Sequence, residues 1–326
     1  MIARYIVQRR MQPLVKKIKA LQFVHIPKLY EQFFYWVQEK NDRPEEWQAI
    51  GDLTIQAIRK HDLYYEDVTP LLYLLDHIAG RQFYPSIRHL FIDEAQDYTP
   101  FQLVYFRTIF PNSRMTILGD LNQSIFTHAV RGETGLTRIE QVFPQDETET
   151  IVLTKSYRST KEIVEFTTHL LGRDLPIEPF DRHGPKPVLT LVATEEKLHE
   201  KIGGKIEELQ ARGHESIAII CKTQKEANRA YKKLQELVPV HLIRKETNQF
   251  VKGITIIPVY LAKGIEFDAV IVYNASEKIY GYEDDRNVLY TACTRAMHEL
   301  QIFSLGAESP LLQSVSEQYY KKTNST

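Results

Sequence analysis

Short apolar runs that alternate with helical patterns are the sequence feature that most constrains the fold of this chain. The first two runs, at residues 89–93 and 115–120, each end in an acidic residue, and an amphipathic helix is expected between them at 99–110. Strands in such a series lie parallel, because each crossover helix returns the chain to the same end of the sheet. The sequence therefore predicts an α/β protein with a parallel sheet.

A second alternating series follows a segment rich in proline and glycine at residues 174–187, which we interpret as a linker. Before the linker, one more strand is expected at 151–155 and a helix at 159–171. After it, the expected strands are residues 188–193, 216–221, 240–243, 253–259, 267–273 and 300–305. The expected helices are residues 195–211, 224–236 and 284–297, and the tail 321–326 is expected to be frayed.

The part of the chain before residue 85 has a helical pattern throughout. Residues 28–40, 44–60 and 66–79 place apolar side chains three and four positions apart, and Gly80 is a suitable stop for the last helix. Residues 1–19 carry six basic residues, and no acidic residue precedes Glu31. A solvent-exposed helix face is the favoured interpretation of this basic stretch, and a contact with nucleic acid is the alternative.

The composition excludes several classes of protein. Lys and Arg total 41 against 42 for Asp and Glu, so no overall field attracts a polyanion, although a local basic stripe can still bind phosphates. The two cysteines, Cys221 and Cys293, cannot form a disulfide framework, which suits a reducing cytoplasm. No uncharged apolar run approaches the roughly 18 residues of a membrane span. We therefore expect a soluble cytoplasmic protein with no membrane partner.

Polar groups follow the first two expected strands directly. Ligands of α/β proteins bind at the carboxyl ends of the parallel strands, so these polar groups are candidates for a binding site. Asp93 and Glu94 are adjacent carboxylates, of which one can coordinate Mg²⁺ while the next orients and deprotonates a water molecule. An amide in the segment 119–123 can sense a terminal phosphate and the attacking water. The alternatives are a helix N-cap for the acidic pair and an ordinary hydrogen-bonded loop for 119–123.

Two arginines lie where a guanidinium can meet phosphate oxygens. Arg158 is expected at a strand-to-helix junction, and Arg295 in a mostly apolar helix, where a buried arginine needs an anionic partner. A charged glycine turn at 262–268 leads into another expected strand. The alternative for Arg295 and Glu94 is that each forms a purely structural pair with another side chain. For the turn at 262–268, the alternative is that its glycine matters more than the charge of Lys263.

Other common chemistries are excluded by the sequence. His199 and Glu200 do not begin a zinc site, because Gly203 occupies the position of the second histidine in H-E-x-x-H. The sequence also contains no C-x-x-C, no G-x-S-x-G and no G-x-G-x-x-G pattern. The sequence therefore gives these other chemistries little support.

Together these segments, which span residues 91–300, resemble the ordered motifs of superfamily 1 helicases of the UvrD/Rep type. Residues 92–97 are similar to the family's Walker B motif, which implies Asp93 as the Mg²⁺ ligand and Glu94 as the catalytic base. The segment 119–125 is similar to the glutamine motif, which implies Gln123 as a sensor of the γ-phosphate of ATP.

The remaining motifs extend the same resemblance. The Tyr-Arg-Ser segment implies a stacking or packing role for Tyr157 and a γ-phosphate contact for Arg158. The Ala-Lys-Gly-Ile-Glu-Phe segment implies that Gly264 and Glu266 bind the nucleotide, with the acid at the ribose. Arg295 matches the arginine finger of the last motif.

A closer branch is suggested by residues 65–74 and 86–92, which are similar to the HelD group, also called helicase IV-like. Gram-positive members of that group act on RNA polymerase and release it from nucleic acid with the help of ATP. The resemblance therefore implies RNA polymerase as a partner besides DNA.

The sequence departs from the family at the phosphate loop, because G-x-x-x-x-G-K-[ST] does not occur in it. Residues 203–206 are the nearest fragment, but they lack the first glycine and the hydroxyl and lie in an expected helix. Without this loop, a backbone cradle and a lysine for the phosphates are missing. We therefore expect this chain to be the C-terminal portion of a longer protein and, by itself, a very poor ATPase. An upstream segment or a separate polypeptide would supply the missing phosphate loop.

Two further departures concern the nucleic acid. The aromatic positions after the glutamine motif are Phe126 and His128, which we predict to contact nucleic acid, although histidine is a weaker stacking platform than tryptophan. Residues 258–261 replace the family's Thr-x-His-Ser. The stretch 158–263 is too short for the large helical insertion of UvrD-type helicases, which favours a translocase or remodeller over a processive unwinder.

We therefore expect an α/β protein with two RecA-like parallel-sheet lobes, the first incomplete, preceded by an all-helical segment. The expected divisions are residues 1–84 (helical segment), 85–175 (C-terminal part of the first lobe), 176–187 (linker), 188–310 (second lobe) and 311–326 (tail). In the intact protein, ATP with Mg²⁺ would bind between the lobes and drive translocation on single-stranded or duplex DNA, or RNA polymerase release. A non-catalytic module that binds RNA polymerase or DNA is the alternative.

Overall fold

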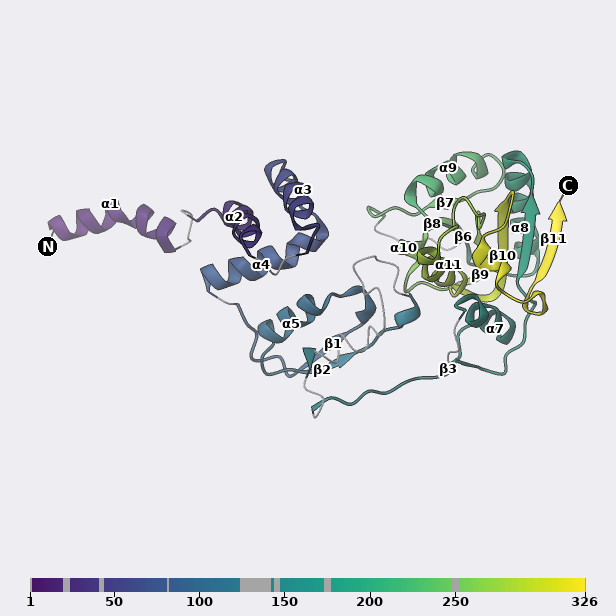
Figure 1. Ribbon diagram of the computed structural model, residues 1–326, viewed down its shortest axis with the longest axis horizontal. Coiled ribbons are helices and arrows are strands. Elements are labelled where there is room, and N and C mark those ends of the chain that lie inside the picture. Colours follow the sequence, from purple (N-terminus) through teal and green to yellow (C-terminus); the bar gives the residue numbers. More distant parts are fainter. Residues whose placement is uncertain are drawn as a thin grey trace. The chain divides into compact units, whose positions relative to one another are not determined.

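The computed structural model describes residues 2–19, 24–40, 44–80, 82–123, 142–143, 147–172, 177–247 and 253–325. The chain divides into two compact units. Unit 1 comprises Met1–Gly119 with Thr137–Pro144, and unit 2 comprises Asp120–Leu136 with Gln145–Thr326. Each unit is a separate body with its own core, and each is described by itself (Figure 1).

Unit 1 begins with four helices. They are α1 (Ile2–Lys19), α2 (Ile26–Gln38), α3 (Trp47–Arg59) and α4 (Tyr65–Ala79). Tyr30, Phe34 and Ile55 form a small apolar core between α2 and α3. The Tyr30 hydroxyl donates to Asp67 of α4 over 2.8 Å. α4 ends at Ala79, and Gly80 follows it with a φ of 93°, which suits glycine.

The α/β part of unit 1 follows these helices. Its elements are β1 (His89–Ile92), the 3₁₀ turn η1 (Ala95–Asp97), α5 (Pro100–Ile109) and β2 (Arg114–Ile117). β1 and β2 are parallel, with Ile92 opposite Ile117. Thr99 caps α5 through a reciprocal capping box with Gln102, and Leu103 of α5 is fully buried against Ile92.

Unit 2 has a longer alternating series. Its strands are β3 (Lys155–Ser156), β4 (Glu178–Pro179), β5 (Val188–Val192), β6 (Ile217–Cys221), β7 (His241–Leu242), β8 (Ile254–Pro258), β9 (Phe267–Val272), β10 (Ala296–Leu305) and β11 (Lys321–Ser325). Its helices are α7 (Lys161–Leu170), α8 (Glu195–Ala211), α9 (Gln224–Leu234), α10 (Val259–Ala262), α11 (Arg286–Cys293) and α12 (Pro310–Gln313). Short 3₁₀ turns are η2 (Leu121–Gln123), η4 (Glu283–Asp285) and η5 (Glu317–Tyr319).

Seven of these strands form one parallel sheet in the order β11-β5-β10-β9-β6-β8-β7. Successive residues of β6 alternate between two apolar cores, with Ile217, Ile219 and Cys221 in one and Ala218 and Ile220 in the other. Helices α8 and α9 cover the first face, and α7, α10 and α11 cover the second (Figure 1). All five β6 residues are buried, as expected for a central parallel strand.

The structure confirms the predicted α/β class with a parallel sheet and a helical segment before it. Three predictions of detail were wrong. Residues 151–154 are not a strand, although the run is apolar, and the side chains of Ile151, Val152 and Leu153 are exposed. The helix predicted at 284–297 stops at Cys293 because β10 begins at Ala296.

The third error concerns the end of the chain. The tail predicted to be frayed instead forms β11, which pairs in parallel with β5 from Lys321 to Ser325. Its polar residues carry no apolar pattern, and the free backbone edge of β5 is what orders them. The predicted domain divisions remain a prediction. In the described parts of the chain, no helix combines the length and apolar character needed to cross a membrane.

Candidate functional site

An acidic loop follows β1 directly in unit 1. The exposed Asp93 accepts the backbone N–H of Glu94 at Oδ1 over 2.8 Å. Glu94 has a left-handed backbone conformation, with φ 52° and ψ 41°, which residues other than glycine seldom adopt. Gln96 is 5% exposed and donates from Nε2 to Oε2 of Glu94 over 2.5 Å. A strained backbone and a buried amide thus fix the direction of the Glu94 carboxylate.

The residue that ends the next strand packs closely on this loop. A Cβ atom at Gly119 would lie 2.6 Å from Oε1 of Gln96 and 3.2 Å from the backbone nitrogen of Ala95. The Ala95 N–H donates to the carbonyl of Leu118 over 2.8 Å, which joins the two strand ends. A side chain at position 119 would therefore displace the amide of Gln96 and press on the backbone of the acidic loop.

Asp93 has the chemistry of a Mg²⁺ ligand. Mg²⁺ takes hard oxygen ligands, commonly one or two carboxylates with several waters. Asp93 is exposed, and only the N–H of Glu94 engages its carboxylate among the described residues. No cluster of three or more potential metal-binding side chains occurs in the parts that the structure describes. A Mg²⁺ ion at Asp93 would therefore complete its coordination with water or substrate oxygens.

Gln123 and Arg295, two residues predicted to contact the γ-phosphate, lie together in unit 2. Nη2 of Arg295 donates to Oε1 of Gln123 over 2.6 Å. Nε2 of Gln123 in turn donates to Oδ2 of Asp120 over 2.8 Å. Gln123 thereby connects a buried guanidinium to the polar turn η2.

Arg295 follows the last turn of α11 and is 2% exposed. Its Nε donates to the carbonyl of Thr291 over 3.2 Å, and its Nη2 also lies 3.2 Å from Oγ1 of Thr294. A carbonyl in the last turn of α11 and the hydroxyl of Thr294 therefore hold the guanidinium. Because arginine stays protonated, this buried group keeps a full positive charge.

Arg158 and Glu266, a second predicted pair, are also brought together. Nε of Arg158 lies 2.8 Å from Oε1 of Glu266, and the two side chains are 70% and 29% exposed. Such an exposed ion pair contributes only about 0–1 kcal/mol to stability, so its partners remain available for other contacts. The ring of Tyr157, mostly exposed, lies 5.2 Å from that of Phe180.

Three hydrogen bonds connect the segments that carry these residues. They are Phe267 N–H to Arg295 O (2.9 Å), Ser159 Oγ to Ala296 O (2.6 Å) and Thr160 N–H to Met297 O (3.1 Å). The segments around Arg158, Glu266 and Arg295 thus meet at the first residues of β9 and β10. Gly264 lies in the turn before β9 and has a φ of 75°, a left-handed conformation that favours glycine at this position.

The predicted site residues fall into two sets. Asp93 and Glu94 belong to unit 1, while Gln123, Tyr157, Arg158, Gly264, Glu266 and Arg295 belong to unit 2. Phe126 and His128, the predicted nucleic-acid residues, lie outside the described residues.

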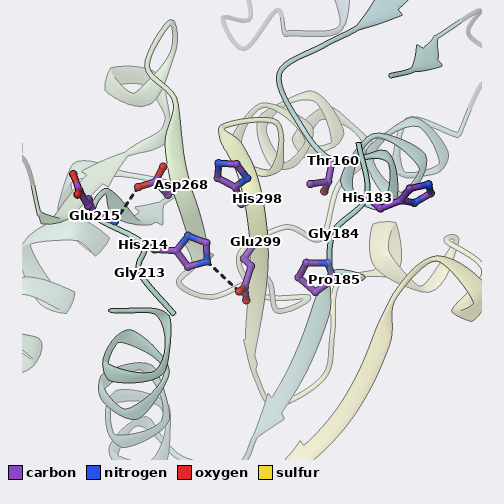
Figure 2. A pocket seen from close by; sticks show the side chains of 10 residues that line it. All are labelled: Thr160, His183, Gly184, Pro185, Gly213, His214, Glu215, Asp268, His298 and Glu299. Atoms are coloured by element: carbon purple, nitrogen blue, oxygen red, sulfur yellow. Dashed lines mark hydrogen bonds and ion pairs between the residues drawn. The ribbon is translucent and has the colours of Figure 1, made fainter. Parts of the chain in front are cut away.

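A polar pocket of about 450 Å³ in unit 2 was not foreseen from the sequence. Figure 2 shows it at the first residues of β9 and β10. Ten residues line it: Thr160, His183, Gly184, Pro185, Gly213, His214, Glu215, Asp268, His298 and Glu299. Histidines scattered along the sequence gave no signal that three of them share one cavity.

The charges of this pocket are largely compensated. Glu299 accepts Nε2 of His214 over 3.0 Å (Figure 2). It also accepts Nη1 of Arg212 over 3.0 Å. Burial raises the pKa of Asp268, but hydrogen bonds from Ser216 and from the Glu215 backbone outweigh it and lower the pKa overall. These interactions tie β9, β10 and the loop before β6 together.

Two family models match the sequence. The UvrD/REP helicase N-terminal domain matches residues 11–132, and the UvrD-like helicase C-terminal domain matches residues 253–302. The first match contains the acidic loop and Gln123. The second contains the turn of Gly264, Glu266 and Arg295.

Two of the individual relatives carry the word helicase in their names. A candidate ATP-dependent DNA helicase of Acanthamoeba polyphaga mimivirus is 27% identical over 246 residues, or 66% of this chain, and the chain spans 34% of that relative's length. The C-terminal domain of a possible DNA helicase from Lactobacillus plantarum WCFS1 is 36% identical, over 51% of this chain and 98% of that one, with a TM-score of 0.46. A variant of S. cerevisiae Dbp5 bound to RNA and ADP BeF3 is 14% identical, over 78% and 64% of the chains, with a TM-score of 0.47.

The sequence matches define the class of protein as a superfamily 1 helicase. The chain belongs to the UvrD/Rep-like family of that superfamily. The resemblance drawn from the ordered motifs is therefore confirmed at the level of the family.

Proposed function

We propose that this chain acts in an ATP-dependent superfamily 1 DNA helicase or translocase. The observation that carries the proposal is the hydrogen bond between Arg295 and Gln123, residues that stand 172 positions apart in the chain. A buried guanidinium is costly unless it has strong acceptors. Phosphate oxygens are stronger acceptors than an amide oxygen, because the bond is then charge-assisted on both sides.

In this proposal, Arg295 exchanges the amide oxygen of Gln123 for the γ-phosphate of ATP. The charge of the guanidinium then stabilises the charge that develops during phosphoryl transfer, and such an arginine is worth about 10³–10⁵ in rate. The amide of Gln123, released from Arg295, can orient the attacking water. Arg158 supplies a second cation when it leaves Glu266, a change that the weak exposed ion pair permits.

The acidic loop of unit 1 has the complementary role. Glu94 acts as the base that takes a proton from water, and Gln96 keeps its carboxylate in one direction. Asp93 would hold Mg²⁺, which neutralises phosphate charge when bound. Gly264 and Glu266 bind the nucleotide, with Glu266 at the ribose, and Tyr157 stacks or packs against it.

Nucleotide discrimination by this chain tests the proposal. A fluorescent ATP analogue is titrated with Mg²⁺ and displaced by unlabelled ATP or ADP, for the wild type and for Arg295→Ala. We expect weak binding, since the sequence has no phosphate loop, with a preference for ATP that Arg295→Ala removes. Arg229→Ala, which removes an exposed arginine of α9 that pairs with Glu195, is the control. Equal displacement by ATP and ADP would contradict a γ-phosphate role.

Single-stranded DNA is the proposed track, and Phe126 and His128 are its proposed contacts. Binding through phosphates should weaken steeply as salt increases. Stacking on Phe126 should add about 1–3 kcal/mol per base. A titration of labelled single strands at several salt concentrations measures both terms, and salt-insensitive binding would count against a helicase-like role.

A HelD-like role in releasing RNA polymerase is the finer form of the proposal. It is supported by the resemblance of residues 65–74 and 86–92 to that group. Co-sedimentation with RNA polymerase at increasing salt distinguishes it from a pure DNA translocase. Stable binding to polymerase without any effect of ATP would instead favour a non-catalytic binding module.

A further inference from the structure

Arg182 lies in the segment that the sequence suggested was a linker, yet it makes four hydrogen bonds there. Its backbone N–H donates to Phe180 over 2.8 Å, and its carbonyl accepts the N–H of Lys161 over 2.7 Å. From its side chain, Nη1 donates to the carbonyl of Arg158 over 3.0 Å. Nη2 lies 2.7 Å from Nδ1 and 2.9 Å from Nε2 of His298.

We infer that Arg182 is a positioning residue for Arg158, and that it holds Arg158 in place only while His298 is neutral. The inference rests on the proposed function, in which Arg158 contacts the γ-phosphate. Arg182 does not touch the reacting atoms in this account. It fixes the backbone from which the side chain of Arg158 extends.

The planar guanidinium explains why an arginine is needed at position 182. Its two terminal nitrogens point in fixed, diverging directions, so one group can bond the carbonyl of Arg158 and the ring of His298 together. A lysine at the same position has one ammonium group on a flexible chain and can satisfy one of these acceptors well. Arg182→Lys should therefore keep part of the restraint and lose the rest.

The ring of His298 makes the restraint depend on protonation. A neutral imidazole has one acceptor nitrogen, which can take the hydrogen bond of Arg182 in either tautomer. An imidazolium has no acceptor and repels the guanidinium. The charged or titratable groups that face His298 are Arg182, Asp268, His214 and Glu299.

The surroundings favour the neutral ring near pH 7. Burial is the largest influence and lowers the pKa of His298, and Arg182 lowers it further, while Asp268 opposes the change. The folded-state pKa therefore lies below the ordinary value of 6.5. The bond from Arg182 is fully present above that pKa and is lost as the pH falls through it.

Position 158 is also connected to the strand that begins after Arg295. Ser159 and Thr160 bond to the carbonyls of Ala296 and Met297, and His298 is the next residue of that strand. Arg182 adds a side-chain link between Arg158 and the same strand. The spacing between the two phosphate-directed arginines is thus set by hydrogen bonds along β10.

Hydrogen exchange at the amides of Thr160 and Lys161 tests the restraint without nucleotide. Losing a hydrogen bond from a charged donor should raise the rate of local opening, so Arg182→Ala should lower protection by about tenfold. Arg182→Lys should lie between Arg182→Ala and the wild type. Arg229→Ala is the control and should leave both amides unchanged. Unchanged protection in Arg182→Ala, with a native circular dichroism spectrum, would overturn the inference.

The pH dependence is tested with His298→Gln, which keeps a neutral acceptor at every pH. Protection factors corrected for intrinsic exchange should fall below pH 6.5 in the wild type, fall less in Arg182→Ala, where burial still lowers the pKa of His298, and stay level in His298→Gln. A wild type without this fall, or a His298→Gln variant with the same fall, would overturn the role of His298.

Nucleotide binding then separates this inference from the proposed function. If both hold, Arg182→Ala weakens the preference for ATP over ADP, and Arg182→Ala with His298→Gln is no worse than Arg182→Ala alone. If the amides lose protection while the preference is unchanged, the restraint exists but the phosphate role of Arg158 is wrong. If the wild type shows no preference, the proposed function itself fails.

Discussion

Nη2 of Arg295 donates to Oε1 of Gln123 over 2.6 Å, so two residues predicted to contact the γ-phosphate are hydrogen-bonded to each other. The bond joins a charged donor to a neutral acceptor, and its strength sets how easily Arg295 changes partner. The pair can be strengthened or removed by substitutions at position 123 alone.

Gln123→Glu should strengthen the pair, because a carboxylate makes a charge-assisted bond with Arg295. We expect the preference for ATP over ADP to fall by about tenfold, since 1.4 kcal/mol of added pairing must be broken first. Gln123→Ala should not hold Arg295 in this way and should keep more of the preference. A Gln123→Glu variant with the same nucleotide preference as the wild type would contradict this account.

Gly119→Ala should disturb the acidic loop, because a Cβ atom at position 119 would meet Oε1 of Gln96 at 2.6 Å. We expect a loss of about 1–3 kcal/mol in the free energy of unfolding, as for other overpacked positions. Exchange of the Ala95 amide should also become faster. Gly204→Ala is the matched control, because that glycine of α8 has nothing within 4 Å of an added Cβ. Alanine there should raise stability by about 0.5–1 kcal/mol, and similar effects of both substitutions would show that space at Gly119 is unimportant.

The parts of the fold that could be predicted are those with a local sequence pattern. The helix predicted at 195–211 coincides with α8, because its apolar positions recur at helical spacing and Thr194 caps it. The apolar run at 216–221 forms the interior strand β6, because a short continuous apolar run suits a strand buried on both faces. The motif order predicts site roles for Asp93 and Arg295, and these roles stay predictions.

Tertiary context decided the rest. Residues 321–325 have no apolar pattern and become a strand only because the edge of β5 accepts them. Residues 151–153 have the pattern but lie outside any strand. Arg182 gave no signal, since its partners Arg158 and His298 are brought to it by the sheet. Local sequence patterns do not show which distant residues the fold will bring into contact.

Lys322→Ala should test whether β11 matters for stability. Nζ of Lys322 lies 2.7 Å from Oε1 of Glu308, whose side chain is 9% exposed, and this contact raises the pKa of Lys322. Removing the lysine leaves a nearly buried carboxylate without its cation, which should cost about 1–3 kcal/mol in urea denaturation. Adding Glu308→Gln should recover part of the loss, and Lys321→Ala in the same strand is the control. A loss in the double variant equal to the sum of the single losses would argue against the pair.

Glu226 at the start of α9 should make stability fall as pH rises. Burial raises the pKa of this carboxyl to about 7, although the backbone N–H of Lys222 donates to it over 2.7 Å and opposes the change. The folded protein therefore keeps a proton that the unfolded chain releases near its ordinary value of 4.5. By linkage, this group lowers the free energy of unfolding between pH 4.5 and 7, and the loss is complete above pH 7.

Glu226→Gln removes the charge while keeping an acceptor for the Lys222 N–H. The shift from 4.5 to about 7 corresponds to about 3 kcal/mol, so the variant should be more stable than the wild type by about 1–3 kcal/mol at pH 8. The advantage should shrink toward zero near pH 5, where the wild-type carboxyl is protonated in the folded state. Urea denaturation at pH 5, 6, 7 and 8 measures the difference, with Glu200→Gln on the exposed face of α8 as the control. A difference between Glu226→Gln and the wild type that is the same at every pH would show that this carboxyl is not the group that titrates.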